Sequence, residues 1–211
     1  GQFIGLIALI NSIIKNTNNL NRIHFYILVD QFEKSELNSL LDTYFKGKVK
    51  YHIKEFEPNT FLEKNIRVIH DNKGTHKVMN FARFYFPNYF QKLDKILYMD
   101  CDMIVQDDIV KLYDSIKLDE FYFAAVTISK IGDFNDFKPI LFKRGIDKKN
   151  DYFNAGLFVT SLKRWEETNT TEKLLEIMVE HKKSKEGLYK FGTQSALNYV
   201  FHNNYENIYR N

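Results

Sequence analysis

The sequence of 211 residues contains one cysteine and three prolines. A single cysteine can form no disulfide within the chain and cannot build a cysteine-rich zinc module, so both classes of small scaffold are excluded. The charges are nearly balanced, with 30 Lys and Arg residues against 27 Asp and Glu residues. A net charge of +3 that is scattered along the chain gives no support for binding to a nucleic-acid backbone.

The chain also lacks a long apolar run. Its longest apolar stretch, Phe3–Ile10, contains Gly5 and is followed by Asn11, whereas a membrane-spanning helix needs roughly 20 apolar residues. No transmembrane helix is therefore expected. The stretch has neither the basic start nor the cleavage pattern of a signal peptide. We interpret it as a helix entered partway through a domain, so the chain is expected to be part of a longer sequence.

The composition that remains is that of a globular protein, with 44% apolar and 27% charged residues. Helical and extended patterns alternate along it, and this order indicates an α/β fold with a mostly parallel central sheet flanked by helices. We find no repeat or linker and expect residues 1–211 to form a single domain. The predicted helices are Leu6–Ile14, Glu33–Phe45, Lys77–Phe90 (bent or ended by Pro87), Thr171–Lys183 and Gln194–Phe201; the predicted strands are Ile23–Val29, Val49–Ile53, Lys95–Met99, Phe121–Val126 and Gly156–Leu162.

Three expectations refine this pattern. Ile23–Val29 is almost wholly apolar and β-rich, which is typical of a central parallel strand covered on both faces. Glu55–Gly74 is expected to be a loop with a short helix near Phe61. The buried face of the helix Glu33–Phe45 is predicted to consist of Leu37, Leu40, Leu41 and Tyr44.

The most specific local feature is Asp100-Cys101-Asp102, directly after an apolar strand. In an extended segment, residues two apart point to the same side, so both carboxylates are predicted to project together and Cys101 to point away, into the core. Ligands of open α/β sheets sit at the carboxyl ends of strands. Two carboxylates suit Mg²⁺ or Mn²⁺, which keep waters and substrate phosphates as further ligands. For this pair alone, however, two polar residues that close a strand are the more frequent case.

Other acidic and histidine residues give weaker signals. An EF-hand that begins at Asp100 is excluded, because Val105 replaces the required glycine and Lys111 the bidentate glutamate. Asp107 and Asp108 are predicted to cap the following helix. A metal site of His70, Asp71 and His76 is conceivable, but a solvated loop is the more frequent outcome for such a segment.

Several ordered blocks give the sequence a resemblance to the family 8 glycosyltransferases, which are retaining nucleotide-sugar enzymes. The resemblance implies a Rossmann-like, glycosyltransferase A-type domain that moves glucose or galactose from a UDP-sugar to a saccharide, lipid-linked or protein acceptor. It also implies Mn²⁺ (or Mg²⁺) on the diphosphate. The sequence leaves the compartment open; of the alternatives, we expect the cytoplasm or the cytoplasmic membrane face, with any peripheral membrane association through segments outside this chain. The matching blocks are Gly5–Asp30, Phe81–Asp114, Tyr152–Trp165 and Thr193–Phe201.

The resemblance assigns a role to each matching residue. Asp100 and Asp102 match the metal-binding motif, and the first of them also lies near the donor ribose. Arg83 matches an arginine over the donor's phosphate and sugar, where its planar fork can bridge phosphate oxygens and a carboxylate. A surface or salt-bridge arginine is the alternative.

The remaining matches concern the transferred sugar. Asn154, Ala155 and Gly156 match a donor-binding segment in which the asparagine contacts the sugar. Gln194 matches a glutamine near the anomeric carbon, on the face opposite the leaving group, so Gln194 and Asn154 are the predicted catalytic residues. Without the resemblance, Asn154–Gly156 would be an ordinary loop before a strand, and Gln194 a solvated residue at a helix start.

The sequence departs from the family at three positions. Thr193 and Ser195 replace acidic residues that flank the glutamine, and Ile128 stands where the family often carries an aspartate. The family's first strand and its C-terminal H-x-x-G-x-x-K-P-W segment, with a third metal ligand, are not matched, so the domain is expected to be incomplete at both ends. A nucleotide-sugar-binding or scaffold domain with impaired catalysis is therefore an alternative. A hydrolase is disfavoured, because two adjacent same-face aspartates cannot flank a glycosidic bond.

Overall fold

The computed structural model describes residues 2–30, 33–57 and 78–208. The chain divides into two compact units, which consist of residues Gly1–Glu57 with Met99–Lys117 and of residues Pro58–Tyr98 with Leu118–Asn211. The prediction that residues 1–211 form one catalytic domain stays a prediction. Across the described ranges, every helix is too short or too polar to cross a membrane.

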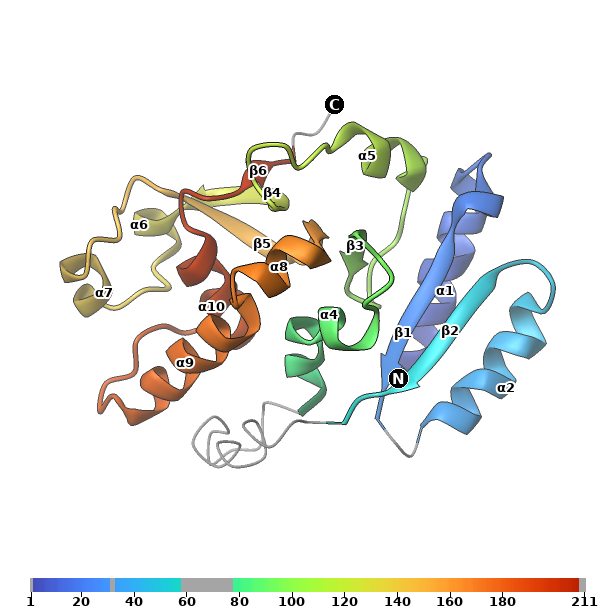
Figure 1. The fold of residues 1–211 in the computed structure, drawn as a ribbon, viewed down its shortest axis with the longest axis horizontal. Helices are drawn as coiled ribbons and strands as arrows, with labels where there is room; N and C mark the ends of the chain where they lie inside the picture. Colours follow the sequence, from blue (N-terminus) through green and yellow to red (C-terminus); the bar gives the residue numbers. More distant parts are fainter. Residues whose placement is uncertain (1, 31–32, 58–77, 209–211) are drawn as a thin grey trace. The chain divides into compact units, whose positions relative to one another are not determined.

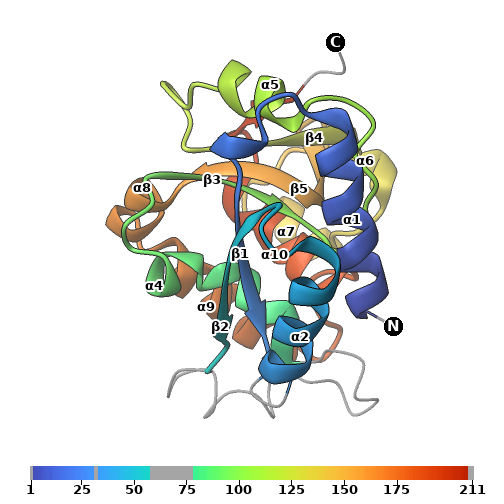
Figure 2. The ribbon, with the colours of Figure 1, turned by 90° about the vertical axis from the view of Figure 1, so that its right-hand side faces the viewer.

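The first unit contains a parallel pair of strands joined by a helix, as predicted. β1 and β2 pair in parallel from His24 opposite Lys50 to Val29 opposite Glu55. Both α1 and α2 pack against this pair (Figures 1 and 2). The elements of the unit are α1 (Gln2–Asn16), the 3-10 turn η1 (Leu20–Arg22), β1 (His24–Val29), α2 (Lys34–Phe45), β2 (Lys50–Glu55) and α5 (Ile109–Ser115).

The core of the first unit corrects two predictions. On α2 the buried residues are Leu37, Leu41 and Phe45, whereas Tyr44 is 53% exposed, because residues four apart form one stripe of a helix. In β1 only Val29 is buried, so the part of the chain that the structure describes does not cover this strand on both faces. Within the described residues β1 pairs with β2 alone. The ring of Tyr26 on β1 stacks on the ring of His52 on β2.

The second unit is built on a four-stranded sheet with the order β3-β5-β4-β6. The long β4–β5 pair is antiparallel, and the short β4–β6 pair is parallel. With the parallel pair of the first unit, this confirms the α/β class. The elements are η2 (Val78–Phe84), α4 (Phe86–Tyr89), β3 (Lys95–Met99), β4 (Phe123–Lys130), α6 (Ile131–Phe134), α7 (Pro139–Lys143), β5 (Asp151–Ser161), α8 (Leu162–Glu167), α9 (Thr170–Lys183), α10 (Gly192–Phe201) and β6 (Glu206–Asn207), with Met99 of β3 assigned to the first unit.

Three predicted elements of the second unit differ from the structure. The strand predicted over Phe121–Val126 is observed as β4, Phe123–Lys130, and so extends four residues further. Instead of one helix over Lys77–Phe90, a 3-10 segment and the four-residue helix α4 follow each other. Pro87 lies in the first turn of α4 rather than at its end, since proline fits a position whose N–H needs no partner within the helix. The loop and short helix predicted near Phe61 lie outside the described residues. β5 begins at Asp151, five residues before the predicted strand.

Aromatic side chains fill the core of the second unit. Phe123 of β4 stacks on Phe201 of α10, with 4.1 Å between the ring centroids, and also contacts Phe158 of β5 and Trp165 of α8. α10 packs against both α9 and β5 (Figure 1). This packing fixes the start of α10, which carries Gln194, relative to the middle of β5.

Candidate functional site

Asp100, Cys101 and Asp102 follow β3, whose predicted end at Met99 is confirmed. The segment is not extended, because Cys101 and Asp102 form a turn. The strand-alternation argument for two carboxylates on one side therefore does not apply to this backbone. Asp100 is half-buried and Asp102 is exposed. Cys101 is also half-buried, so the prediction that it packs into the core is only partly met.

Helix α1 holds the segment that follows the turn. The Ser12 hydroxyl accepts a hydrogen bond from the Val105 N–H (2.9 Å) and donates to the Leu9 carbonyl (2.7 Å). The Asn16 amide donates to the Val105 carbonyl over 2.8 Å. The N–H and the carbonyl of Val105 are thus both hydrogen-bonded to side chains of α1, as they would be to the backbone of a neighbouring strand. The aspartate turn is therefore fixed at its downstream end.

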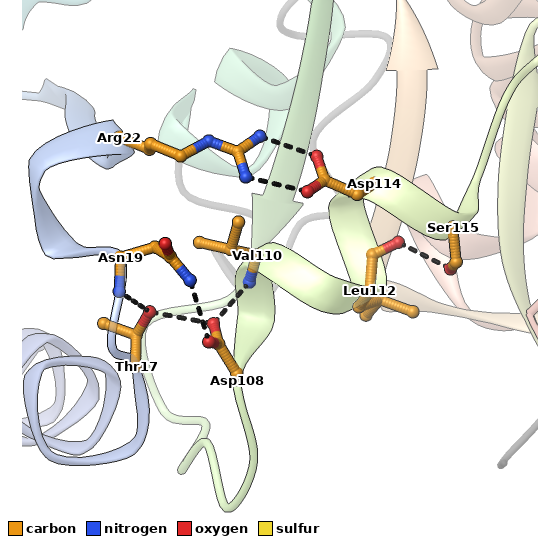
Figure 3. A network of polar contacts seen from close by, with 8 residues as sticks. All are labelled: Thr17, Asn19, Arg22, Asp108, Val110, Leu112, Asp114 and Ser115. Atoms are coloured by element: carbon orange, nitrogen blue, oxygen red, sulfur yellow. Dashed lines mark hydrogen bonds and ion pairs between the residues drawn. The ribbon is translucent and has the colours of Figure 1, made fainter.

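The same segment ends in a polar network around Asp108 (Figure 3). Asp108 is the N-cap of α5 and accepts the Val110 N–H over 3.0 Å, which confirms the predicted cap. It also accepts from Thr17 (2.8 Å), and these bonds hold the pKa of the Asp108 carboxyl below its usual value. Asp107 instead accepts the N–H of its neighbour Asp108 (2.6 Å).

The residues at the turn fit a divalent cation that keeps most of its own waters. Burial raises the pKa of the Cys101 thiol, and the charges of Asp102 and Asp100 raise it further, so both carboxylates act on one small region. Two carboxylates are a suitable share of the octahedral ligands of Mg²⁺ or Mn²⁺. Within the part of the chain that the structure describes, no group of three or more metal-ligating side chains occurs. His70, Asp71 and His76 lie outside that part.

The second unit places Asn154, Ala155 and Gly156 inside β5, where the pairing with β4 is interrupted. Ala125 of β4 lies opposite Phe158, but the next residue, Val126, lies opposite Asn154. Residues 155–157 therefore have no partner on β4. A bulge of this kind re-aims side chains and frees peptide groups. The predicted loop before a strand is in fact an irregularity within a strand.

The freed peptide groups of Ala155 are bound by two predicted site residues. The Arg83 guanidinium donates to the Ala155 carbonyl over 3.3 Å, and the Ala155 N–H donates to Oε1 of Gln194 over 3.1 Å. Arg83 also lies over the ring of Tyr98, 5.2 Å from its centroid. The exposed Asn154 side chain accepts the Gly156 N–H over 2.7 Å. Residues from η2, β5 and α10 thus meet at one bulge.

Behind Gln194 lies a fully buried carboxylate that sequence reasoning missed. Asp136 has no exposed surface and accepts the hydroxyls of Tyr152 (2.7 Å) and Ser195 (3.0 Å) and the N–H of Lys190 (2.6 Å). Burial, and then the charge of Asp136, raise the pKa of Tyr152, so its hydroxyl stays protonated at neutral pH. Its position between Phe134 and Phe137 was the only local signal of burial.

A second missed residue is Asn198 of α10, which is buried beneath β5. Its side chain accepts the Phe153 N–H (2.8 Å) and donates to the Phe153 carbonyl (2.9 Å), as a strand neighbour would. It also donates to the Gln194 carbonyl over 3.1 Å. An amide on an otherwise apolar helix face was the signal that could have identified it. Asn198 fixes β5 next to Asn154.

The three departures from the family pattern lie in different environments. Ile128 is an extra residue of β4, because Thr127 lies opposite Phe153 while Ser129 lies opposite Tyr152, and it is 46% exposed. Thr193 and Ser195 are buried. Ser195 is therefore a packed residue that bonds to Asp136 rather than a solvated replacement of an acid.

The structure thus brings five predicted residues together in the second unit: Arg83, Asn154, Ala155, Gly156 and Gln194. Asp100 and Asp102 belong to the first unit, together with α1 and α5. What each set can do chemically follows from its own geometry.

Comparison with solved structures identifies the fold. The fold matches the galactosyltransferase LgtC solved with donor and acceptor sugar analogs, with a TM-score of 0.74 at 20% identity over 97% of this chain and 69% of that one. A structure of an active-site glutamine-to-glutamate mutant of LgtC matches with a TM-score of 0.75, also at 20% identity, over 97% of this chain and 68% of that one. These likenesses confirm the glycosyltransferase A-type fold.

The sequence comparison extends over nearly the whole chain. Glycosyltransferase 8 domain-containing protein 1 of Xenopus laevis is 33% identical over 227 residues, which cover 97% of this chain and 60% of that protein. This chain therefore spans about 60% of the length of that relative. The model of the family described as glycosyl transferase family 8 matches residues 3–211. The chain belongs to glycosyl transferase family 8.

Proposed function

We propose that the chain carries out retaining transfer of a hexose, glucose or galactose, from a UDP-sugar to a saccharide, lipid-linked or protein acceptor. Family membership supports the reaction class, and the sugar analogs bound to LgtC support a sugar donor and a sugar acceptor. One observation carries the proposal. Both peptide groups of Ala155, inside the β5 bulge, are bound by Arg83 and Gln194.

In the second unit we assign the transferred sugar to the bulge. Asn154 is exposed and its amide can bind a sugar hydroxyl. The carbonyl oxygen of Gln194 accepts one hydrogen bond from Ala155 and keeps a second lone pair. That lone pair can stabilise positive charge at an anomeric carbon, since a fixed dipole is effective where charge develops. A neutral amide is a poor nucleophile, so we propose that the acceptor hydroxyl attacks the anomeric carbon on the face that UDP vacates. The bond from the anomeric carbon to UDP breaks, and the proton of the acceptor hydroxyl passes to the departing diphosphate oxygen.

In the first unit we assign the diphosphate and its cation to Asp100 and Asp102. Their two carboxylates would hold Mn²⁺ or Mg²⁺, and α1 keeps the segment after them in place through Val105. A bound cation would supply positive charge that favours departure of UDP. The two aspartates themselves only bind and orient, because both are needed as ionised ligands.

A binding domain without turnover is the second candidate. The exposed Ile128 in the β4 bulge favours it, because an apolar side chain there offers no hydrogen bond to a sugar hydroxyl. In this case the chain would bind a UDP-sugar and leave it intact. The hydrogen bonds around Gln194 would then have a purely structural role.

The test separates binding from transfer in the intact protein. Calorimetric titration with UDP-glucose and UDP-galactose, with and without Mn²⁺, measures binding, and NMR of the product's anomeric proton measures transfer and configuration. We expect binding that requires Mn²⁺ and an α-linked product from an α-linked donor. An inverted product would refute retention, and Mn²⁺-dependent binding without UDP release would establish the binding domain instead.

A further inference from the structure

A chain of hydrogen bonds in the second unit has its direction fixed at both ends. The N–H of Ala155 donates to Oε1 of Gln194 (3.1 Å), and Nε2 of Gln194 donates to the Tyr152 hydroxyl (3.3 Å). The Tyr152 hydroxyl in turn donates to Oδ2 of Asp136 (2.7 Å). A backbone N–H can only donate, so the first link cannot be reversed.

The carboxylate end is equally constrained. Oδ1 of Asp136 accepts the backbone N–H of Lys190 (2.6 Å) and the hydroxyl of Ser195 (3.0 Å). The Ser195 hydroxyl already accepts the N–H of Phe191 (2.8 Å), so its own hydrogen is directed to Asp136. Every group that faces Asp136 in these bonds is therefore a donor. Its other oxygen is left to accept from Tyr152.

Burial makes this direction costly to violate. Asp136, Tyr152 and Ser195 have no exposed surface, and Ala155 is 1% exposed. Gln194 itself is half-buried, but the Ala155 N–H and the Tyr152 hydroxyl are buried and cannot turn to bulk water. A buried donor without a partner costs more free energy than an ordinary hydrogen bond contributes. If the Gln194 amide rotated by half a turn, Nε2 would face the Ala155 N–H. The arrangement thus permits one orientation of the amide.

We propose that Asp136 and Tyr152 are positioning residues for sugar transfer, which act by fixing the orientation of the Gln194 amide. The inference rests on the proposed function, in which Oε1 of Gln194 faces the reacting carbon. Neither Asp136 nor Tyr152 needs to contact the sugar. Their effect on the reaction passes entirely through Gln194.

The sharpest test is Asp136→Asn, which changes the direction of the hydrogen-bond chain while the side chain keeps nearly the same shape. The Lys190 N–H keeps the carbonyl oxygen of the new amide on its own side, so the new NH₂ group faces Tyr152. The Tyr152 hydroxyl must then accept this hydrogen bond and point its own hydrogen at Gln194. Gln194 is left with a donor on both sides, and no orientation of its amide satisfies both. We expect kcat to fall about tenfold or more, with little change in the KM for the donor.

Tyr152→Phe is the milder variant, because it removes the hydroxyl between Gln194 and Asp136 but does not reverse the direction of any hydrogen bond. We expect kcat to fall about three- to tenfold. The matched control is Tyr122→Phe, which also deletes a buried hydroxyl of this unit; that hydroxyl bonds to Thr170 (3.0 Å) and not to Gln194. The control should lose stability to a similar degree and keep kcat. Thermal melting of all variants separates folding from positioning.

Two further measurements exclude a merely structural role. In a Gln194→Ala background, Asp136→Asn and Tyr152→Phe should have no additional effect on kcat. By NMR, the side-chain amide protons of Gln194, one of five glutamines and assigned by their absence in Gln194→Ala, should exchange faster with solvent in Tyr152→Phe but not in Tyr122→Phe. Equal losses of kcat with and without Gln194, or unchanged exchange in Tyr152→Phe, would overturn the proposal.

Failure of the proposed function gives a different result. If the unmodified protein transfers no sugar, the transferase proposal is refuted, and the positioning of a reaction by Asp136 and Tyr152 is refuted with it. The exchange rates of the Gln194 amide then still report whether the hydrogen-bond chain exists. If the exchange of the Gln194 amide protons changes in Tyr152→Phe but the unmodified protein is inactive, the transferase function is wrong. If the exchange does not change and the unmodified protein is active, the positioning role of Asp136 and Tyr152 is wrong.

Discussion

Gly5 of α1 lies directly against the backbone carbonyl of Cys101, so closely that a β-carbon at Gly5 would be 2.7 Å from that oxygen. Real β-carbons do not approach a carbonyl oxygen to this distance. The helix can therefore pass the aspartate turn at this distance only because residue 5 has no side chain. With Ser12 and Asn16, which bind Val105, Gly5 makes α1 the support of the Asp100–Asp102 turn.

Gly5→Ala should destabilise the protein, although alanine normally stabilises a helix relative to glycine by about 1 kcal/mol. Overpacking costs about 1–3 kcal/mol, and the upper part of this range applies because the contact is with a backbone atom, so we expect a net destabilisation of about 1–2 kcal/mol. The turn should shift, and Mn²⁺-dependent binding of UDP should weaken. Urea unfolding and calorimetry measure both effects. Ile4→Ala, at a 76% exposed site of the same helix, is the control and should change neither; a stabilised Gly5→Ala variant would contradict the close contact.

Asp102→Asn should abolish the metal dependence of nucleotide binding. It replaces one of the two charged ligands that we propose for the cation, and the described residues contain no group of three or more metal-ligating side chains that could compensate for its loss. Interactions with charged groups contribute about 1.5–3 kcal/mol, so UDP affinity in Mn²⁺ should fall about 10- to 100-fold. Asp107→Asn, at an exposed carboxylate five residues away, should leave UDP affinity unchanged. Equal affinity of Asp102→Asn and the unmodified protein in Mn²⁺ would remove Asp102 from the site.

Asp108 should make the stability of the first unit depend on pH in the acid range. Its pKa is lowered in the folded state, first by the Thr17 hydroxyl, so its contribution is present above the pKa of the unfolded chain, about 4. That contribution is lost as the pH falls through the lowered folded value. Asparagine remains a good N-cap, so Asp108→Asn should keep most stability at pH 7 and show a shallower loss below pH ~4.

Unfolding of Asp108→Asn in urea at a series of pH values checks this. Thr17→Val removes the hydroxyl donor, so it should also reduce the loss of unfolding free energy at acid pH. If the free energy of unfolding falls with pH as steeply in Asp108→Asn as in the unmodified protein, another carboxyl is responsible. NMR titration of the Asp108 carboxyl identifies the group directly.

Local patterns predicted the elements well because they depend on side-chain period. The helix α1 and the strands β1 and β3 begin and end within a few residues of their predicted bounds. Where two neighbouring positions were both apolar, the pattern could not choose between them, and Tyr44 was taken for the buried Phe45. Predictions failed mainly where a second element decides the outcome.

The candidate site shows the same limit. The residue types Arg83, Asn154 and Gln194 were found from the sequence, but their contacts depend on a bulge that exists only because β4 and β5 change register. Asp136 was not found, since its partners lie 16 to 59 residues away in the chain. A hydrogen bond between distant segments has no periodicity, so composition and spacing carry no sign of it.

Arg83→Lys should lower turnover far more than stability. Arg83 lies over Tyr98 and donates to the Ala155 carbonyl, and a lysine cannot keep a planar stack while it also presents a fork to phosphate oxygens. Loss of a charge-assisted contact of about 1.5–3 kcal/mol predicts a fall in kcat of about 10- to 100-fold.

Arg164 provides the matched control for this substitution. It lies over the ring of Tyr122, 5.3 Å from its centroid, and donates to the carbonyls of Leu118 (3.1 Å) and Glu120 (3.2 Å), all within the same unit. Because Arg164 has a comparable stack and comparable backbone bonds, Arg164→Lys should lower the melting temperature at least as much as Arg83→Lys and leave kcat unchanged. Melting curves and single-turnover rates of the two variants distinguish the roles. If Arg83→Lys melts several degrees lower and retains full turnover, Arg83 supports the bulge and does not act on the donor.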